Sequence, residues 1–148
     1  MGVVANAALD AGGAAIGVVP KSLVEHEIAH NSLSDLHIVG SMLERKATMS
    51  DLSEGFIVLP GGTGTLEEFF EVLTWAQLGE HGKSCGLLNV AGYYDLLVSV
   101  FDHMVDRGFL SETNLSIVLV ETEPTALLGR LEEYQPPATP KWIGRSET

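Results

Sequence analysis

The 148-residue sequence has a single cysteine, few basic residues and no long apolar run. Cys85 has no second cysteine to pair with, so an internal disulfide is excluded, and so are the usual zinc sites built from clusters of Cys and His. His26 and His30 have the i, i+4 spacing of some metal ligands, and HEIAH over 26–30 has the letters of the HExxH pattern, which is a short motif and not a metal site by itself. Solvated or core histidines are the better interpretation, and we expect no metal.

The shortage of basic residues makes the chain strongly acidic, with eight Lys and Arg against twenty Asp and Glu and a formal charge of -12. This charge repels a phosphate backbone and argues against nucleic acid as a partner. A small anion is still acceptable, because backbone dipoles at a helix N-terminus can bind it. No apolar run approaches the roughly 20 residues of a membrane span, and the first residues lack a signal-peptide pattern. We expect no membrane association and a cytoplasmic location.

Short apolar runs alternate with amphipathic segments along the chain, which is typical of an α/β domain. The apolar runs predict strands at 15–19, 36–39, 56–59, 85–90 and 117–120. Helices are predicted over 3–11, 41–53, 65–78, 93–107 and 125–134. Apolar strands separated by helices indicate a doubly wound parallel sheet, in which ligands bind at the carboxyl ends of strands. One domain is expected over 1–134, followed by a loosely attached tail over 135–148.

A glycine-rich segment, PGGTGTLEE over 60–68, joins a predicted strand to a predicted helix. Its glycines let a ligand approach the backbone, which a Cβ would obstruct. Its threonines add hydroxyl donors, and the helix N-terminus adds free N–H groups and a partial positive charge. The segment therefore predicts a phosphate-binding turn, made of Gly61, Gly62, Thr63, Gly64 and Thr65. It is not a P-loop, because no Lys follows the glycines, and it lacks the GxGxxG spacing of a dinucleotide site.

Two further features have both a structural and a functional interpretation. Thr65 and Glu68 have the spacing of a capping box, with Thr65 as N-cap and Glu68 bonding back to its N–H. Alternatively, the Glu68 carboxylate beside an anion site acts on the ligand. Arg45 and Lys46 are the only adjacent basic pair in the chain, and an isolated pair is usually a solvated helix face.

Together these segments resemble the LOG ("lonely guy") family of cytokinin riboside 5'-monophosphate phosphoribohydrolases. PGGTGTLEE at 60–68 is similar to that family's PGGxGTxxE motif, and MLERK at 42–46 to its MxxRK motif. The resemblance implies a Rossmann-like fold and cleavage of the N-glycosidic bond of a nucleoside 5'-monophosphate, AMP or a cytokinin ribotide. It also implies a homodimer. We expect no cofactor. Members often carry the label "lysine decarboxylase", but no pyridoxal-phosphate lysine site is recognisable here.

Carried over by position, the resemblance implies that Arg45 and Glu68 are the catalytic pair, although the sequence does not separate their roles. The substrate-binding residues that it implies are Met42, Lys46, Gly61, Gly62, Thr63, Gly64 and Thr65. The dimer would form across the helices predicted at 41–53 and 65–78. Their apolar residues exceed what one sheet face can cover, and include Met49, Trp75 and Leu78.

One departure from the family concerns the start of the sheet. Family members begin with a βαβ unit that precedes the Met-Gly seen here at Met1 and Gly2. Without it, the expected sheet has a gap between the strands at 15–19 and 56–59, and the ligand pocket lacks one wall. A truncated sequence and a genuinely shortened, inactive protein are both consistent with this. The alternative function is a binding protein of the same superfamily, like a molybdenum-cofactor carrier, although Arg45 and Glu68 together favour the enzyme.

Overall fold

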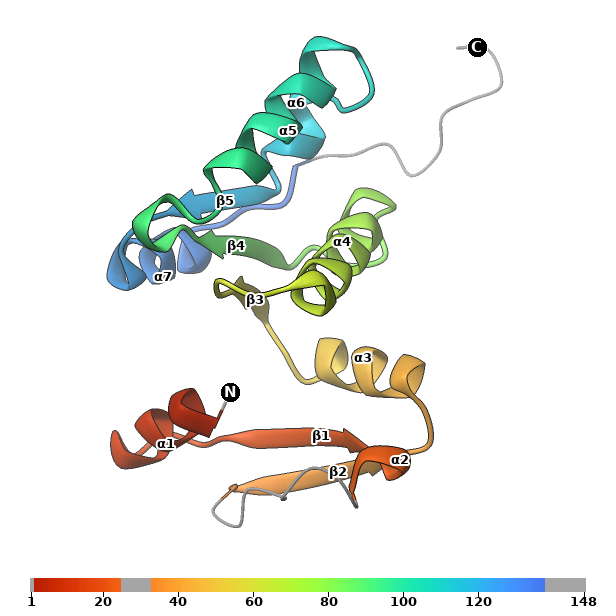
Figure 1. The fold of residues 1–148 in the computed structure, drawn as a ribbon, viewed down its shortest axis with the longest axis vertical. Helices are drawn as coiled ribbons and strands as arrows, with labels where there is room; N and C mark the ends of the chain where they lie inside the picture. The colour runs from red at the N-terminus through yellow and green to blue at the C-terminus, as the bar shows by residue number, and fades with distance from the viewer. Residues whose placement is uncertain (1, 25–32, 138–148) are drawn as a thin grey trace. The chain divides into compact units, whose positions relative to one another are not determined.

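The computed structural model describes residues 2–24 and 33–137. The chain divides into two compact units, residues 1–53 and 54–148. Every strand pair in the described residues is parallel, and helices separate successive strands (Figure 1). The predicted α/β class with a Rossmann-like parallel sheet is therefore confirmed. The described strands form one two-stranded and one three-stranded sheet. The assignment of 1–134 to a single domain stays a prediction.

The first unit is built on two parallel strands. Its elements are α1 (Gly2–Asp10), β1 (Ile16–Pro20), α2 (Lys21–Val24), β2 (Asp35–Val39) and α3 (Met42–Asp51). Gly12 ends α1 with a φ of +81°, a left-handed conformation that glycine adopts without strain. Ser41 caps α3, because its side chain accepts a hydrogen bond from the Glu44 N–H at 3.1 Å. The carboxyl end of β2 thus leads directly into the helix that carries Arg45 and Lys46.

The second unit is built on the strand order β3-β4-β5. Its strands are β3 (Gly55–Val58), β4 (Ser84–Leu88) and β5 (Val118–Glu121). Its helices are α4 (Thr63–Gln77), the 3-10 turn η1 (Val90–Gly92), α5 (Asp95–Asp106), α6 (Glu112–Leu115) and α7 (Pro124–Glu132). All five residues of β4 are buried, as expected for the central strand of a sheet that is covered on both faces.

Two apolar clusters on opposite faces of this sheet hold the second unit together. Leu87 of β4 belongs to the larger cluster, with side chains from α4 and α5, whereas the next residue, Leu88, packs with Leu127 of α7. Successive strand residues point to opposite faces, so this alternation confirms the doubly wound arrangement within the unit. Gly86 lets α7 pack closely, since a Cβ there would lie 2.8 Å from the Leu127 Cδ1 atom.

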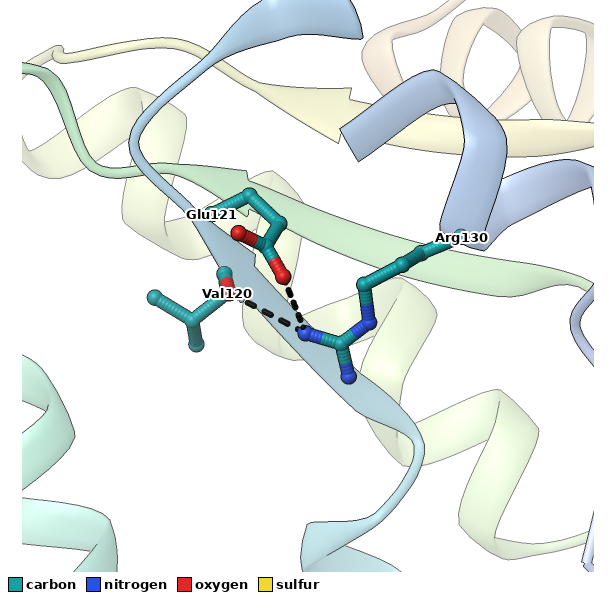
Figure 2. A network of polar contacts seen from close by, with 3 residues as sticks. All are labelled: Val120, Glu121 and Arg130. Carbon is teal, nitrogen blue, oxygen red and sulfur yellow. Dashed lines mark hydrogen bonds and ion pairs between the residues drawn. The ribbon is translucent and has the colours of Figure 1, made fainter. Parts of the chain in front are cut away.

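Arg130 attaches the last helix to the edge strand of the second unit (Figure 2). Its Nη1 atom donates to the Val120 carbonyl at 3.1 Å and to Oε1 of Glu121 at 2.8 Å. The guanidinium thereby joins α7 to the carboxyl end of β5. Both side chains of the ion pair are partly exposed, so its contribution to stability is modest, on the order of 0–1 kcal/mol.

The helix after the glycine-rich turn begins two residues earlier than predicted, at Thr63 instead of Thr65, and Gly62 is its N-cap. The capping-box interpretation, with Thr65 as N-cap and Glu68 bonding back to it, is therefore wrong. The short elements α2, η1 and α6 were not predicted. Most of the predicted tail, 138–148, lies outside the described residues, as do His26 and His30. No helix in the part of the chain that is described has the length and apolar character to span a membrane.

Candidate active site

The candidate site in the second unit is the glycine-rich turn between β3 and α4. The first backbone hydrogen bond of the helix runs from the Leu66 N–H to the Gly62 carbonyl, at 3.2 Å. No side chain caps the helix. Within the described ranges, the N–H groups of Thr63, Gly64 and Thr65 have no hydrogen-bond acceptor. Three parallel N–H dipoles at the positive end of a 15-residue helix form a site suited to an anion.

The glycines of the turn differ in whether the surrounding structure has room for a Cβ. A Cβ on Gly61 would lie 2.8 Å from the Thr65 Cβ, so the packing of the first helical turn requires a glycine there. Gly62 and Gly64 have no positive φ, and a Cβ at either position would meet nothing within 4 Å. The chain's own packing thus does not require glycine at position 64, where it costs the helix about 1 kcal/mol relative to alanine. A ligand in close contact with the backbone would require it.

Glu68 lies in the second turn of α4 and is half-buried. It stands four residues after Gly64, so the two share one face of the helix. Helical side chains tilt toward the N-terminus, which directs the carboxylate toward the turn. With the capping box excluded, this placement is consistent with a role at the ligand.

Arg45, Lys46 and Met42 lie on α3 in the first unit. Arg45 is half-buried, and its Nε donates to the Val18 carbonyl in β1 at 3.1 Å. This bond fixes the direction of the guanidinium relative to the two-stranded sheet. The predicted catalytic residues Arg45 and Glu68 thus belong to different units, and both their catalytic role and their meeting at one site stay predictions.

Two tyrosines that the sequence analysis did not assign to the site contact the glycine-rich turn. The Tyr93 hydroxyl donates to the Gly61 carbonyl at 2.7 Å, and the Tyr94 hydroxyl donates to the Leu59 carbonyl at 2.6 Å. Burial, with a smaller effect of Tyr93, raises the pKa of Tyr94, so its hydroxyl stays protonated and able to donate. The pair Tyr93-Tyr94 in the sequence was the available signal, but its partners lie more than 30 residues away.

Two other potentially reactive side chains of the second unit, Cys85 and His81, are held within the fold. Burial raises the pKa of the Cys85 thiol to about 12, so the thiolate nucleophile does not form near neutral pH. His81 accepts from the Lys83 N–H and bonds to the Val72 carbonyl, and burial lowers its pKa. In the described ranges, no three His, Cys, Asp or Glu side chains are grouped as a metal site would need.

Fold and turn together define the class of protein: a Rossmann-like parallel α/β protein with a glycine-rich turn at a strand–helix junction. Residues 1–131 match the family described as "Possible lysine decarboxylase", and the chain belongs to this family. The family resemblance predicted from the two sequence motifs is therefore confirmed.

Curated relatives share a more specific name. Cytokinin riboside 5'-monophosphate phosphoribohydrolase LOG3 of Arabidopsis thaliana is 46% identical over 136 residues, which cover 92% of this chain and 63% of that protein. The Rhodococcoides fascians protein named cytokinin riboside 5'-monophosphate phosphoribohydrolase is 51% identical over 121 residues, 81% of this chain and 61% of that protein. The chain thus spans somewhat over three fifths of the length of these two relatives.

Proposed function

We propose that this chain hydrolyses the N-glycosidic bond of cytokinin riboside 5'-monophosphates, and of AMP, to a free base and ribose 5-phosphate. One observation carries the proposal: the first turn of α4 presents three N–H groups without an acceptor in the described residues, beside a glycine that no packing contact requires. A 5'-phosphate fits this feature. The names of the relatives supply the class of reaction.

In the proposed reaction, water attacks C1' of the ribose and the bond from C1' to the base nitrogen breaks. The electron pair goes to the base, which takes up a proton, and positive charge develops on the ribose. Glu68 is the proposed group that stabilises this charge or orients the water. Arg45 supplies positive charge to the phosphate or to the departing base. Met42 and Lys46 are proposed to contribute to substrate binding, and no cofactor takes part.

The proposal is tested by incubating the chain with isopentenyladenosine 5'-monophosphate or AMP and measuring the free base by chromatography. Base released by the native chain, and not by heat-denatured chain, supports the proposal. A ligand that binds without release of base supports the alternative, a binding protein for phosphorylated compounds.

Replacing Gly64 with alanine separates ligand binding from folding. Because nothing surrounds a Cβ at this position, we expect the free energy of unfolding to stay the same or rise by up to about 1 kcal/mol. The added methyl group occupies the space of a phosphate oxygen, so KM for the nucleotide should rise about 10-fold or more. Steady-state kinetics and thermal unfolding measure the two effects.

Gly129→Ala is the matched control for this substitution. Gly129 is also a helical glycine, in α7, and a Cβ there would have no neighbouring atom within 4 Å. Its replacement should stabilise the helix to a similar extent and leave KM unchanged. A Gly64→Ala variant with the wild-type KM would show that the phosphate does not bind at this turn.

We also propose that the chain is a homodimer that uses α3 and α4. Leu78, the C-cap residue of α4, is 59% exposed, while Met49 and Trp75 are half-buried. Exposed leucine near the end of an amphipathic helix is consistent with a contact between chains. Light scattering at micromolar concentration should give twice the chain mass, and Leu78→Glu should shift the result toward the monomer. A monomeric wild-type chain would contradict the proposal.

A further inference from the structure

The connection between β4 and α5 holds the glycine-rich turn at two points. The Tyr94 hydroxyl bonds to the Leu59 carbonyl, and the Tyr93 hydroxyl bonds to the Gly61 carbonyl, one on each side of Pro60. The two rings pack edge to face, with their centroids 5.0 Å apart. Tyr94 is 2% exposed and belongs to the core, whereas Tyr93 is 54% exposed. The turn is thus attached to the core through one ring and restrained near the surface by the other.

The backbone that precedes Tyr93 and Tyr94 has a bend that sets the direction of their side chains. Ala91 and Gly92 both have positive φ, +51° and +72°, and for alanine this conformation costs on the order of 1 kcal/mol. Buried Asn89 fixes the bend, because its Oδ1 accepts from the Tyr94 N–H at 2.7 Å and its Nδ2 donates to the Asp95 carboxylate at 2.8 Å. A strained bend held by a buried side chain indicates that the direction of the tyrosines matters.

The bond from Tyr93 has a specific consequence for the helix. In a regular continuation of α4, the Gly61 carbonyl would accept from the Thr65 N–H, four residues on. The carbonyl instead accepts from Tyr93, and in the described residues the Thr65 N–H has no acceptor. Tyr93 therefore prevents α4 from extending by one more residue at its N-terminus. Without that restraint, the Thr65 N–H would gain the Gly61 carbonyl as an internal partner and would no longer be open to an anion.

We propose that Tyr93 and Tyr94 are positioning residues, which hold the backbone of the glycine-rich turn with its N–H groups open to a phosphate. We call the two hydrogen bonds from Tyr93 and Tyr94 to the turn the clamp. The identity of the ligand rests on the proposed function, but the clamp itself is a property of the chain. Neither hydroxyl needs to touch the reacting atoms. The clamp should affect binding of the phosphate and leave the chemical step little changed.

Tyr93→Phe is the sharpest test, because the ring is largely exposed and loss of its hydroxyl should leave the melting temperature unchanged. We expect hydrogen exchange at the Thr65 amide to become slower, because this N–H gains the Gly61 carbonyl as its acceptor once the Tyr93 bond is lost. The Kd for inorganic phosphate, followed by NMR of the amides of the turn, should rise about 3- to 10-fold, the effect of one lost hydrogen bond. KM for the nucleotide should rise equally, with kcat within twofold of wild type. Tyr94→Phe should act in the same direction and also lower the melting temperature.

Tyr134→Phe is the matched control, since Tyr134 packs in the other cluster, with Leu59, Leu88 and Leu127, and within the described residues its hydroxyl makes no hydrogen bond to the turn. It should change neither the exchange rates nor the Kd. Unchanged exchange and phosphate affinity in Tyr93→Phe would overturn the clamp, even where the wild-type chain releases base. Failure of wild type to bind phosphate or release base would count against the proposed function instead. In that case the exchange rates of Tyr93→Phe would still test whether the tyrosines hold the turn, independently of the proposed function.

Discussion

Glu68→Gln is expected to lower kcat by about 10²-fold or more while KM for the nucleotide changes little. The substitution keeps the size of the side chain and removes the negative charge that would face the positive ribose of the transition state. An interaction made only in the transition state appears in kcat and not in ground-state binding. Because Gly62, and not Thr65, is the N-cap of α4, the glutamine disturbs no capping box, and the melting temperature should change little.

Glu67→Gln controls for the loss of one negative charge near the start of α4. Glu67 is the adjacent residue in the same helical turn but is exposed, whereas Glu68 is half-buried. Both variants alter the field at the helix N-terminus by a similar amount, so a general electrostatic effect would appear in both. We expect Glu67→Gln to retain wild-type kcat to within about threefold. Full turnover by Glu68→Gln would remove Glu68 from the catalytic pair.

AMP should be a far better substrate than adenosine, with a ratio of kcat/KM of about 10²- to 10⁶-fold. The 5'-phosphate would accept two or three charge-assisted hydrogen bonds from the N–H groups at the start of α4, each worth about 1.5–3 kcal/mol. Adenosine forfeits all of them, although its base and ribose are identical. Parallel assays of base release from the two compounds, at equal enzyme concentration, give the ratio directly.

Inorganic phosphate and ribose 5-phosphate provide the control for this ratio. Both carry the group that the turn is proposed to bind, so both should inhibit AMP cleavage competitively, and chloride at the same ionic strength should inhibit less. The Gly64→Ala variant should lose much of the discrimination between AMP and adenosine. Comparable turnover of AMP and adenosine by the wild-type chain would rule out the turn as a phosphate site.

The local chemistry of the sequence was sufficient to predict most elements of the fold. Strands such as β3 and β4 are short apolar runs bounded by glycine, proline or polar residues. These runs alone located the strands within about two residues. The start of α4 was misplaced because Thr65 has the side chain of a good N-cap. Gly62 also serves as an N-cap without any side-chain bond, and that possibility leaves no distinctive sequence pattern.

The tertiary part of the candidate site could not be predicted from local patterns. The bonds from Tyr93 and Tyr94 join residues 32 and 35 positions apart, and the bond from Arg45 to the Val18 carbonyl spans 27. The two tyrosine contacts depend on how β3 and β4 pair and on the left-handed bend at Ala91. A left-handed alanine is rare, and nothing in the sequence marks it. Motif spacing identified which residues belong to the turn, but not what holds it.

The most direct test of the central claim is product analysis by mass spectrometry after incubating the full chain with isopentenyladenosine 5'-monophosphate in ¹⁸O-labelled water. Hydrolysis of the N-glycosidic bond predicts equal amounts of free isopentenyladenine and ribose 5-phosphate, at a rate that Glu68→Gln reduces about 10²-fold. The label should enter the sugar phosphate and not the base. Unchanged nucleotide that nonetheless binds to the chain would contradict the claim, and so would isopentenyladenosine with labelled inorganic phosphate.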